Sequence, residues 1–282
     1  LIEAERITHF NGVPTMSMEL MNHPRLAHHD LSSLLDICAG GAARPAGHVA
    51  QLLEKFPAAP PSAGYGLTET NAVGCVIAQE DYAERPRSAG RPSAPLIEIR
   101  IIDENGVPLP QGESGEIWIR TPAVASGYWN RPEATAEAFV DGGFRTGDVG
   151  YLDDEGFVYI VDRIKDIIIR GGENISCLEV EEALYTHPQV VEAAVFGLPD
   201  PRLGEVVGAA VMTRDGQELE TQEIRSFLAD KLAVFKVPEH VWCHAEHLPR
   251  IASGKIFKKQ LRSELINRLG LGAARDGNPP AA

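Results

Sequence analysis

The chain has 282 residues, of which 44% are hydrophobic and 23% charged, a composition typical of a globular protein with a sizeable core. Its 40 acidic residues outnumber the 26 Lys and Arg residues, and the net charge of -14 argues against general binding to nucleic acid or anionic membranes. No CxxC pair and no apolar run near the roughly 20 residues that span a bilayer occurs, which disfavours a disulfide scaffold, structural zinc and a transmembrane segment. We therefore expect a cytoplasmic protein.

Residues 1–87 combine short apolar runs with helical periodicity and are expected to form α/β structure. Apolar residues from Val49 to Phe56 recur at i, i+3, i+4 and i+7, which predicts one face of an amphipathic helix. Pro57 follows and ends the helix, and the chain then enters a glycine-rich turn at Gly64.

The pattern changes between 88 and 161 to short strands, such as 97–102 and 116–120, separated by glycine-containing turns. We expect a small β-barrel subdomain, or an antiparallel sheet, whose last strand is 157–161. The charged crossing 162–166 has no proline and no residue that we expect to be buried, so few contacts should hold it.

Residues 167–268 predict a compact α+β domain with the order strand, helix, strand, strand, helix, strand. These elements are expected at 167–169, 178–185, 190–196, 206–212, 221–232 and 237–244. The tail 269–282 is rich in Gly, Ala and Pro, and we expect it to be disordered.

Two phrases in the first part could hold a nucleotide. Gly40 and Gly41 follow an apolar strand, so backbone can approach a flat ligand there, although an ordinary strand-to-helix turn uses the same residues. Tyr65 can stack on a base, Thr68 can bind phosphate, and Glu69 can hold Mg²⁺. A turn capped by threonines is the structural alternative.

Three later sequence motifs contain further candidate site residues. Asp148 follows Thr-Gly, on an expected loop, and its carboxylate can accept both hydroxyls of a ribose, whereas a simple Asx turn is the alternative. Gly172 ends a glycine pair beside which a thin ligand arm can pass. Lys255 lies on a Ser-Gly loop before a basic helix, where a lysine is otherwise only a solvated charge.

In order and spacing, these phrases resemble the adenylate-forming (AMP-binding) enzymes, which include acyl-CoA synthetases, luciferases and nonribosomal adenylation domains. The resemblance covers about 5–265 and is carried by Tyr65-Gly66-Leu67-Thr68-Glu69-Thr70, Thr146-Gly147-Asp148, the phrase 162–176 and Ser253-Gly254-Lys255. Gly171-Gly172-Glu173-Asn174-Ile175 is most similar to the fatty-acyl-CoA and coumarate-CoA ligases. It implies that 1–87 ends a large AMP-binding domain and that 167–268 is a mobile C-terminal domain.

The resemblance also implies roles for single residues. The nucleotide would be held by Gly40, Gly41 and Ala42 at the adenine, by Tyr65, Gly66 and Arg163, and by Asp148 at the ribose. The catalytic residues would be Thr68, which contacts phosphate, Glu69, which ligates Mg²⁺, and Lys255, which offsets charge as pyrophosphate leaves. Gly172 would border the coenzyme A tunnel, and Lys165 would be the hinge pivot.

The implied reaction is that of an acid-thiol ligase: a carboxylic acid, ATP and CoA give acyl-CoA, AMP and pyrophosphate through an acyl-adenylate. A non-catalytic AMP-binding remnant, and a luciferase-like or other adenylate-forming enzyme, remain as alternatives. The acyl substrate and the oligomeric state do not follow from the sequence.

The chain opens at Leu1 and soon enters a strand-like phrase at 7–10, so we expect a C-terminal portion of a longer enzyme. Its sequence contains no Gly-rich phosphate loop ending in Lys-Gly, and we therefore expect the chain alone to be inactive in adenylation. His9 would border the acyl pocket or be a buried core histidine. Metal binding by His240, His244 and His247 with Cys243 is disfavoured because this segment alternates like a strand.

Overall fold

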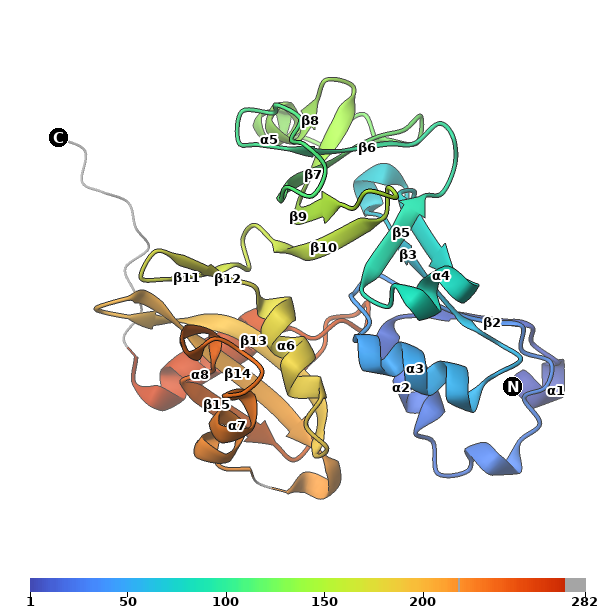
Figure 1. The fold of residues 1–282 in the computed structure, drawn as a ribbon, viewed down its shortest axis with the longest axis vertical. Helices are drawn as coiled ribbons and strands as arrows, with labels where there is room; N and C mark the ends of the chain where they lie inside the picture. Colours follow the sequence, from blue (N-terminus) through green and yellow to red (C-terminus); the bar gives the residue numbers. More distant parts are fainter. Residues whose placement is uncertain (218, 272–282) are drawn as a thin grey trace. The chain divides into compact units, whose positions relative to one another are not determined.

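The structure, a computed structural model, describes residues 1–217 and 219–271, and its mixed α/β fold divides into two compact units (Figure 1). The first unit ends at Ile164 and the second begins at Lys165. Eight α-helices and two β-sheets are formed by the described residues. From residue 272 onward, the tail that we expect to be disordered lies outside the described residues.

The first unit contains five α-helices among its residues: α1 (Ile2–Glu5), α2 (Pro14–Met21), α3 (Ala46–Lys55), α4 (Gln79–Glu84) and α5 (Pro132–Ala138). Short 3₁₀ helices lie at Leu26–His28 and Thr68–Thr70. Its strands are β1 (His9–Gly12), β2 (Asp36–Gly40), β3 (Pro61–Tyr65), β4 (Cys75–Ala78), β5 (Ser88–Pro92), β6 (Glu98–Ile102), β7 (Gly115–Arg120), β8 (Phe139–Val140), β9 (Gly143–Leu152) and β10 (Val158–Arg163).

These strands form one sheet in the order β1-β2-β3-β4-β5-β10-β9-β7-β6, with β8 paired to β9. Strands β1, β2 and β3 are parallel, and every pairing from β3–β4 onward is antiparallel. The pairings within the described part of this unit continue from β5 to β6 without returning to the first strand. A separate β-barrel subdomain is therefore not confirmed, and the strands of 88–163 extend the sheet instead.

Helix α3 confirms the amphipathic pattern. Val49 and Leu52 are each 1% exposed, and Leu52 packs with Phe56, Met21 and Ile37 in one apolar cluster. Burial of each such side chain stabilises the fold by about 1.5–3 kcal/mol. This packing places α3 against Ile37 of β2.

The second unit contains three α-helices in its described part: α6 (Cys177–Tyr185), α7 (Thr221–Leu228) and α8 (Lys258–Leu269). Its strands β11 (Ile168–Arg170), β12 (Glu173–Ile175), β13 (Val190–Asp200) and β14 (Gly204–Thr213) are antiparallel in the order β12-β11-β14-β13, and β15 (His240–His244) pairs in parallel with β14. Helix α6 is capped by Ser176, whose side chain accepts the Glu179 N–H at 3.1 Å.

The apolar run of β13 is continuous because both faces of its sheet are covered by helices. Ala193 and Val195 face the cluster that contains α6 and α7, whereas Ala194, Phe196 and Leu198 face the cluster that contains α8. Alternate residues of a strand point to opposite faces, so burial of both faces explains why the run from Ala193 to Leu198 is apolar throughout.

Two expected elements are shorter than predicted. Helix α7 ends at Leu228 rather than 232, and β15 begins at His240 rather than 237. A 3₁₀ helix at Val234–Lys236 and Pro238, which has no N–H for a ladder, occupy the difference.

The crossing 162–166 also differs from expectation. Strand β10 continues to Arg163, and Asp162, opposite Val149 of β9, is only 2% exposed. The expectation that this segment has no buried residue is therefore wrong at Asp162, because the β9–β10 ladder extends into it. Residues 164–166 form a turn in which Lys165 is exposed.

Candidate active site

Glycine backbone lies at the sheet edge where β2 and β3 end, beside Tyr65. The two strands are parallel, and Gly40 lies opposite Gly64 in their register. A Cβ added to Gly40 would lie 3.3 Å from the Gly64 carbonyl oxygen, and Gly41 follows with a φ of 79°, in the region that favours glycine. Ligands of α/β sheets bind at such carboxyl ends of strands, so this edge suits a flat group.

The loop after β3 is closed tightly around two glycines. A Cβ on Gly66 would lie 2.5 Å from the Ala72 carbonyl, and one on Gly74 would lie 2.3 Å from the Tyr65 carbonyl oxygen. The buried Thr70 hydroxyl accepts the Leu67 N–H at 3.1 Å and donates to the Leu67 carbonyl at 3.2 Å. The threonine-capped turn is thus present, and it leaves Thr68 exposed and Glu69 half-buried at the loop surface.

Asp148 lies at the centre of a network that joins three strands. Its Oδ2 accepts the Tyr65 hydroxyl at 2.8 Å, and its Oδ1 accepts the Arg163 Nε–H at 2.7 Å. Asp148 and Arg163 are opposite one another in the β9–β10 register, which explains their pairing. Burial and the nearby Asp148 carboxylate raise the pKa of Tyr65 well above its usual range, so this hydroxyl stays a donor.

Asp148 differs from expectation in its local structure. It lies within strand β9 and not on a loop, and its carboxylate oxygens bind side chains from β3 and β10 rather than local backbone N–H groups. The Asx-turn alternative is therefore wrong.

Glu116 of β7 holds the phrase that precedes Asp148. Its Oε1 accepts the Gly147 N–H at 2.9 Å, and its Oε2 accepts the Arg145 Nε–H at 2.8 Å. Thr146 donates to the Ile117 carbonyl at 2.7 Å, and its Oγ1 also accepts the Asp148 N–H at 3.1 Å. Sequence reasoning missed Glu116 because it looks like an ordinary polar residue of a strand.

Glu69 is held by the loop that follows β7. The Tyr128 hydroxyl donates to Glu69 Oε1 at 2.7 Å, and the Ala125 N–H donates to the Glu69 carbonyl at 2.8 Å. The Tyr128 ring packs edge-on against Phe139 at 5.3 Å, and Thr135 Oγ1 accepts the Tyr128 N–H at 2.9 Å. Burial and the Glu69 contact raise the pKa of Tyr128 to about 12. Sequence reasoning missed Tyr128; the only signal was an aromatic in the turn phrase Gly127-Tyr128-Trp129.

Two carboxylates have oxygens that could bind a ligand: Glu69 is suited to Mg²⁺, and Asp148 is suited to a ribose. No hydrogen bond from the described residues reaches Glu69 Oε2, and Mg²⁺ usually takes one or two protein carboxylates with phosphate and water oxygens as the remainder. No cluster of three or more His, Cys, Asp or Glu suited to a metal occurs in the described ranges. Asp148 uses two of about four lone-pair sites, which leaves room for ribose hydroxyls, although its side chain is only 8% exposed.

Gly172 and Lys255 lie in the second unit. Gly172 has a φ of 92° in the turn between β11 and β12, where an added Cβ would meet nothing within 4 Å. Lys255 is exposed on the loop between β15 and α8, and its amine has no hydrogen bond or ion pair with any described residue. The roles of Gly172 at the coenzyme A path and of Lys255 in catalysis remain predictions.

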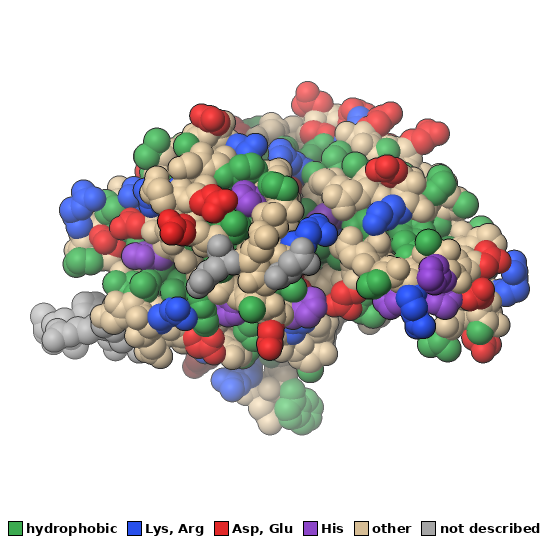
Figure 2. All heavy atoms as spheres, turned by 90° about the horizontal axis from the view of Figure 1, so that it is seen from below, with side chains coloured by type: hydrophobic (Ala, Val, Ile, Leu, Met, Phe, Trp, Pro, Cys, Tyr) green, Lys and Arg blue, Asp and Glu red, His purple; other side chains and the backbone are tan. Residues whose placement is uncertain are grey.

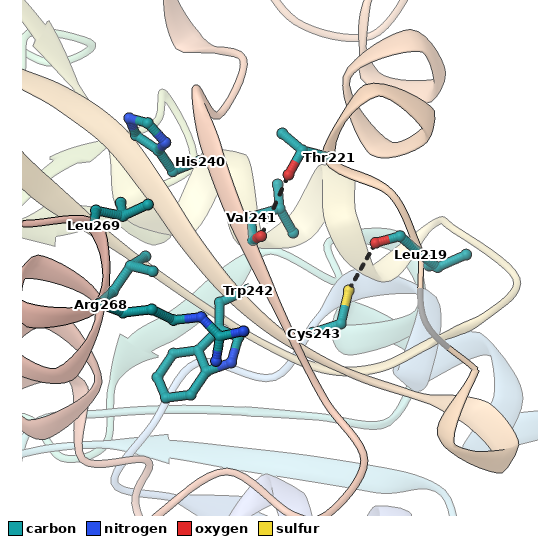
Figure 3. Close-up of a pocket in the computed structure, with 9 residues that line it drawn as sticks. Leu219, Thr221, His240, Val241, Trp242, Cys243, Arg268 and Leu269 are labelled. Carbon is teal, nitrogen blue, oxygen red and sulfur yellow. Dashed lines mark hydrogen bonds between the residues drawn. The ribbon is translucent and has the colours of Figure 1, made fainter.

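A cavity of about 180 Å³ in the second unit contains none of the predicted site residues. It is lined by Leu219, Thr221, His240, Val241, Trp242, Cys243, Leu265, Arg268 and Leu269 (Figure 3). Arg268 lies over the Trp242 ring at 5.4 Å, and the Cys243 thiol donates to the Leu219 carbonyl at 3.1 Å. Cys243 is therefore engaged with backbone.

His9 is exposed, with its Nδ1 2.9 Å from Thr8 Oγ1, so the interpretation as a buried core histidine is wrong. In the described ranges, the helices are all too short or too polar to cross a membrane. Acidic and basic side chains are interspersed on the face drawn in Figure 2, which matches the mixed charge of the sequence.

Two models of known families match this chain. The model of the AMP-binding enzymes matches residues 1–129, and the model of the AMP-binding enzyme C-terminal domain matches residues 179–255. The chain belongs to the AMP-binding, adenylate-forming enzymes.

Similar proteins include a CoA synthase, a CoA ligase and an amide bond synthetase. The chain is 44% identical to a feruloyl-CoA synthase from Amycolatopsis sp, over 93% of this chain and 52% of that protein. It is 41% identical to a long-chain-fatty-acid–CoA ligase from Bacillus subtilis, over 94% and 47%. The structure of the amide bond synthetase McbA from Marinactinospora thermotolerans superposes with a TM-score of 0.85 at 38% identity, over 94% and 53%.

Membership in the AMP-binding enzymes confirms the resemblance that the sequence phrases carry. The chain spans about half the length of these relatives. Acyl-CoA ligases are among them, whereas McbA is named for amide bond formation. The roles of the single residues stay predictions.

Proposed function

We propose that this chain is the nucleotide-holding and lysine-bearing part of an ATP-dependent acyl-CoA ligase. In this reaction, a carboxylate oxygen attacks the α-phosphorus of ATP and pyrophosphate leaves; the CoA thiol then attacks the acyl carbon, and AMP leaves. The observation that carries the proposal is the network in which Asp148 is held by Tyr65 and Arg163. A buried carboxylate with two fixed partners and spare lone pairs is suited to a ribose diol.

The adenosine would lie at the glycine edge of the sheet. Gly40, Gly41 and Ala42 would line the adenine through backbone atoms, and Gly66 would allow the loop after β3 to approach the base. Because the Tyr65 hydroxyl is bonded to Asp148, its ring is held at this edge. Arg163, whose Nε–H is accepted by Asp148 and whose side chain is 44% exposed, would be a second contact to the nucleotide beside the ribose.

Glu69 and Thr68 would act at the phosphates. Glu69 Oε2 would bind Mg²⁺, while Tyr128 fixes Oε1, and the exposed Thr68 hydroxyl would donate to a phosphate oxygen. When bound, Mg²⁺ would offset the charge of the phosphates. The chain has no Gly-rich loop ending in Lys-Gly, so we propose that adenylation requires this further element and that the chain alone does not complete it.

The second unit would serve both half-reactions. Lys255 would offset the charge that develops as pyrophosphate leaves, and the turn at Gly172 would border the path of coenzyme A. Lys165, exposed in the turn between the two units, would be the pivot. In this proposal, 1–87 ends the large AMP-binding domain, 88–161 is its β subdomain, 162–166 is the hinge and 167–268 is the mobile C-terminal domain.

A second candidate is an adenylate-forming enzyme with an amine acceptor in place of CoA. The similarity to the amide bond synthetase McbA, at 38% identity over 94% of this chain, favours it. Both candidates share the first half-reaction and differ in the nucleophile that attacks the acyl-adenylate.

The test begins with binding of AMP to the chain, measured by titration calorimetry. We expect a Kd between about 10 μM and 1 mM, and no more than a twofold change in the control Tyr151→Phe, a half-buried tyrosine stacked on Tyr159. A folded chain that binds no AMP at 5 mM contradicts the proposal. Supplying ferulate or a long-chain fatty acid with ATP, and then CoA or an amine, to a form that includes a phosphate loop separates the two candidates by their products.

Tyr128→Phe is expected to raise the Mg²⁺ concentration needed for half-maximal ATP binding by about three- to tenfold. The ring keeps its packing on Phe139, but Glu69 Oε1 loses the hydroxyl that holds it at 2.7 Å. The measurement is ATP binding by calorimetry over a Mg²⁺ series, with AMP binding without metal as the internal control. Unchanged Mg²⁺ dependence would exclude the Tyr128 hydroxyl as a support for Glu69.

A further inference from the structure

Glu192 is a buried carboxylate of β13 that no predicted role uses. It is 4% exposed and lies in the sheet of the second unit. Its Oε2 accepts the Leu248 N–H at 2.9 Å, and its Oε1 lies 2.6 Å from both an Arg250 guanidinium nitrogen and His247 Nδ1. All three partners come from one segment, 247–250, more than 50 residues along the chain. A buried carboxylate needs such partners, so the strand and the segment are fixed to one another.

The same segment leads directly into the loop that carries Lys255. The second terminal nitrogen of Arg250 donates to the Gly254 carbonyl at 2.9 Å. The Gly254 N–H donates to the Ile251 carbonyl and the Ile251 N–H to the Lys255 carbonyl, each at 2.9 Å. Arg250 therefore connects Glu192 to the residue next to Lys255 through two hydrogen bonds. The Lys255 side chain itself is exposed and makes no bond to the described residues.

We propose that Glu192 and Arg250 are positioning residues for Lys255. Glu192 anchors the guanidinium from the rigid sheet, and the guanidinium fixes the turn 250–256, so that the Lys255 amine is presented from a defined backbone. A mobile lysine would spend part of its time away from the developing charge, whereas a preorganised one does not. The catalytic role of Lys255 rests on the proposed function; the ordering of its loop does not.

The test compares Glu192→Gln with Glu181→Gln. Glu181 is a matched control, because it is also a poorly exposed carboxylate of this unit that accepts a backbone N–H, from Val195 at 2.8 Å, and pairs with a cation, Lys258. Hydrogen exchange of the Ile251 and Gly254 amides is measured by NMR. We expect exchange at least tenfold faster in Glu192→Gln and within twofold of the parent in Glu181→Gln. Equal exchange of these amides in Glu192→Gln and the parent would overturn the proposal.

A second readout connects the loop to catalysis. Where adenylation is observed, Glu192→Gln is expected to lower its kcat about tenfold with KM within twofold, and to have less than a twofold effect in a Lys255→Ala background. An equal loss in both backgrounds would show that Glu192 does not act through Lys255. If neither the parent nor any variant forms an adenylate in a form that includes a phosphate loop, the proposed function fails, while the exchange result still decides the positioning of the loop.

Arg250→Lys tests the proposal independently, in case Glu192→Gln does not fold. Lysine keeps the positive charge beside Glu192, but one amine cannot replace the two guanidinium nitrogens that bind Glu192 and Gly254. We expect at least threefold faster exchange of the Gly254 amide with a thermal midpoint close to that of the parent. Parent-like exchange in this variant would overturn the role of Arg250.

Discussion

Replacing Lys255 with alanine is expected to slow adenylate formation by about 10²–10³-fold, the loss typical when one group that stabilises transition-state charge is removed. Its amine is exposed on a turn with an ordered backbone and has no competing partner among the described residues. AMP binding should change by less than twofold, because the sugar and base contacts proposed above come from other residues. The measurement is single-turnover pyrophosphate release in a form competent for adenylation.

Lys259→Ala provides the control for general charge. Lys259 is an exposed cation of α8, four residues further along the chain. We expect its loss to change the rate by no more than twofold. Comparable losses in the two variants would indicate that the basic surface as a whole, and not the Lys255 amine, accelerates the reaction.

Asp148→Asn is expected to weaken AMP binding by about 10–100-fold. Asparagine keeps the shape of the side chain but removes the negative charge and one acceptor oxygen, and charge-assisted hydrogen bonds are roughly twice as strong as neutral ones. Because the Arg163 side chain is 44% exposed, we expect the lost ion pair to lower the free energy of unfolding by only about 1 kcal/mol. Calorimetry with AMP and thermal unfolding measure the two effects.

A comparison with 2′-deoxy-AMP tests the assignment of Asp148 to the ribose. The parent chain should bind 2′-deoxy-AMP more weakly than AMP, whereas Asp148→Asn should discriminate much less between them. Asp153→Asn is the control, since Asp153 Oδ1 accepts the Glu155 and Phe157 N–H groups in a hairpin turn. If Asp148→Asn retains full discrimination, another group holds the 2′-hydroxyl.

Local patterns predicted most of the secondary structure. The apolar periodicity from Val49 to Phe56 is α3, and the strand expected at 190–196 lies within β13. The patterns succeeded here because one face of α3 and both faces of β13 are buried. They were less accurate at 229–239, where Pro238 and a 3₁₀ helix interrupt the periodicity. For 88–161, the described strands pair antiparallel, as the sheet alternative predicts, whereas the β-barrel is not confirmed.

Local patterns did not predict the residues that hold the candidate site residues in place. Tyr128 reaches Glu69 across 59 positions, and Glu192 reaches Arg250 across 58. Neither pair has a local spacing that signals contact. Long-range pairs of this kind are set by strand register and loop closure, which a single sequence does not display.

The sequence by itself determined the family and the candidate residues, because its glycines, carboxylates and lysine stand in short phrases whose order is preserved along the chain. Tertiary structure alone decided which side chains hold them. Asp148 became the partner of Tyr65 and Arg163 only when β3, β9 and β10 were brought together in one sheet. The physical reason is that a phrase specifies local backbone and chemistry, whereas the partners of a buried charge are supplied by whichever strands pack beside it.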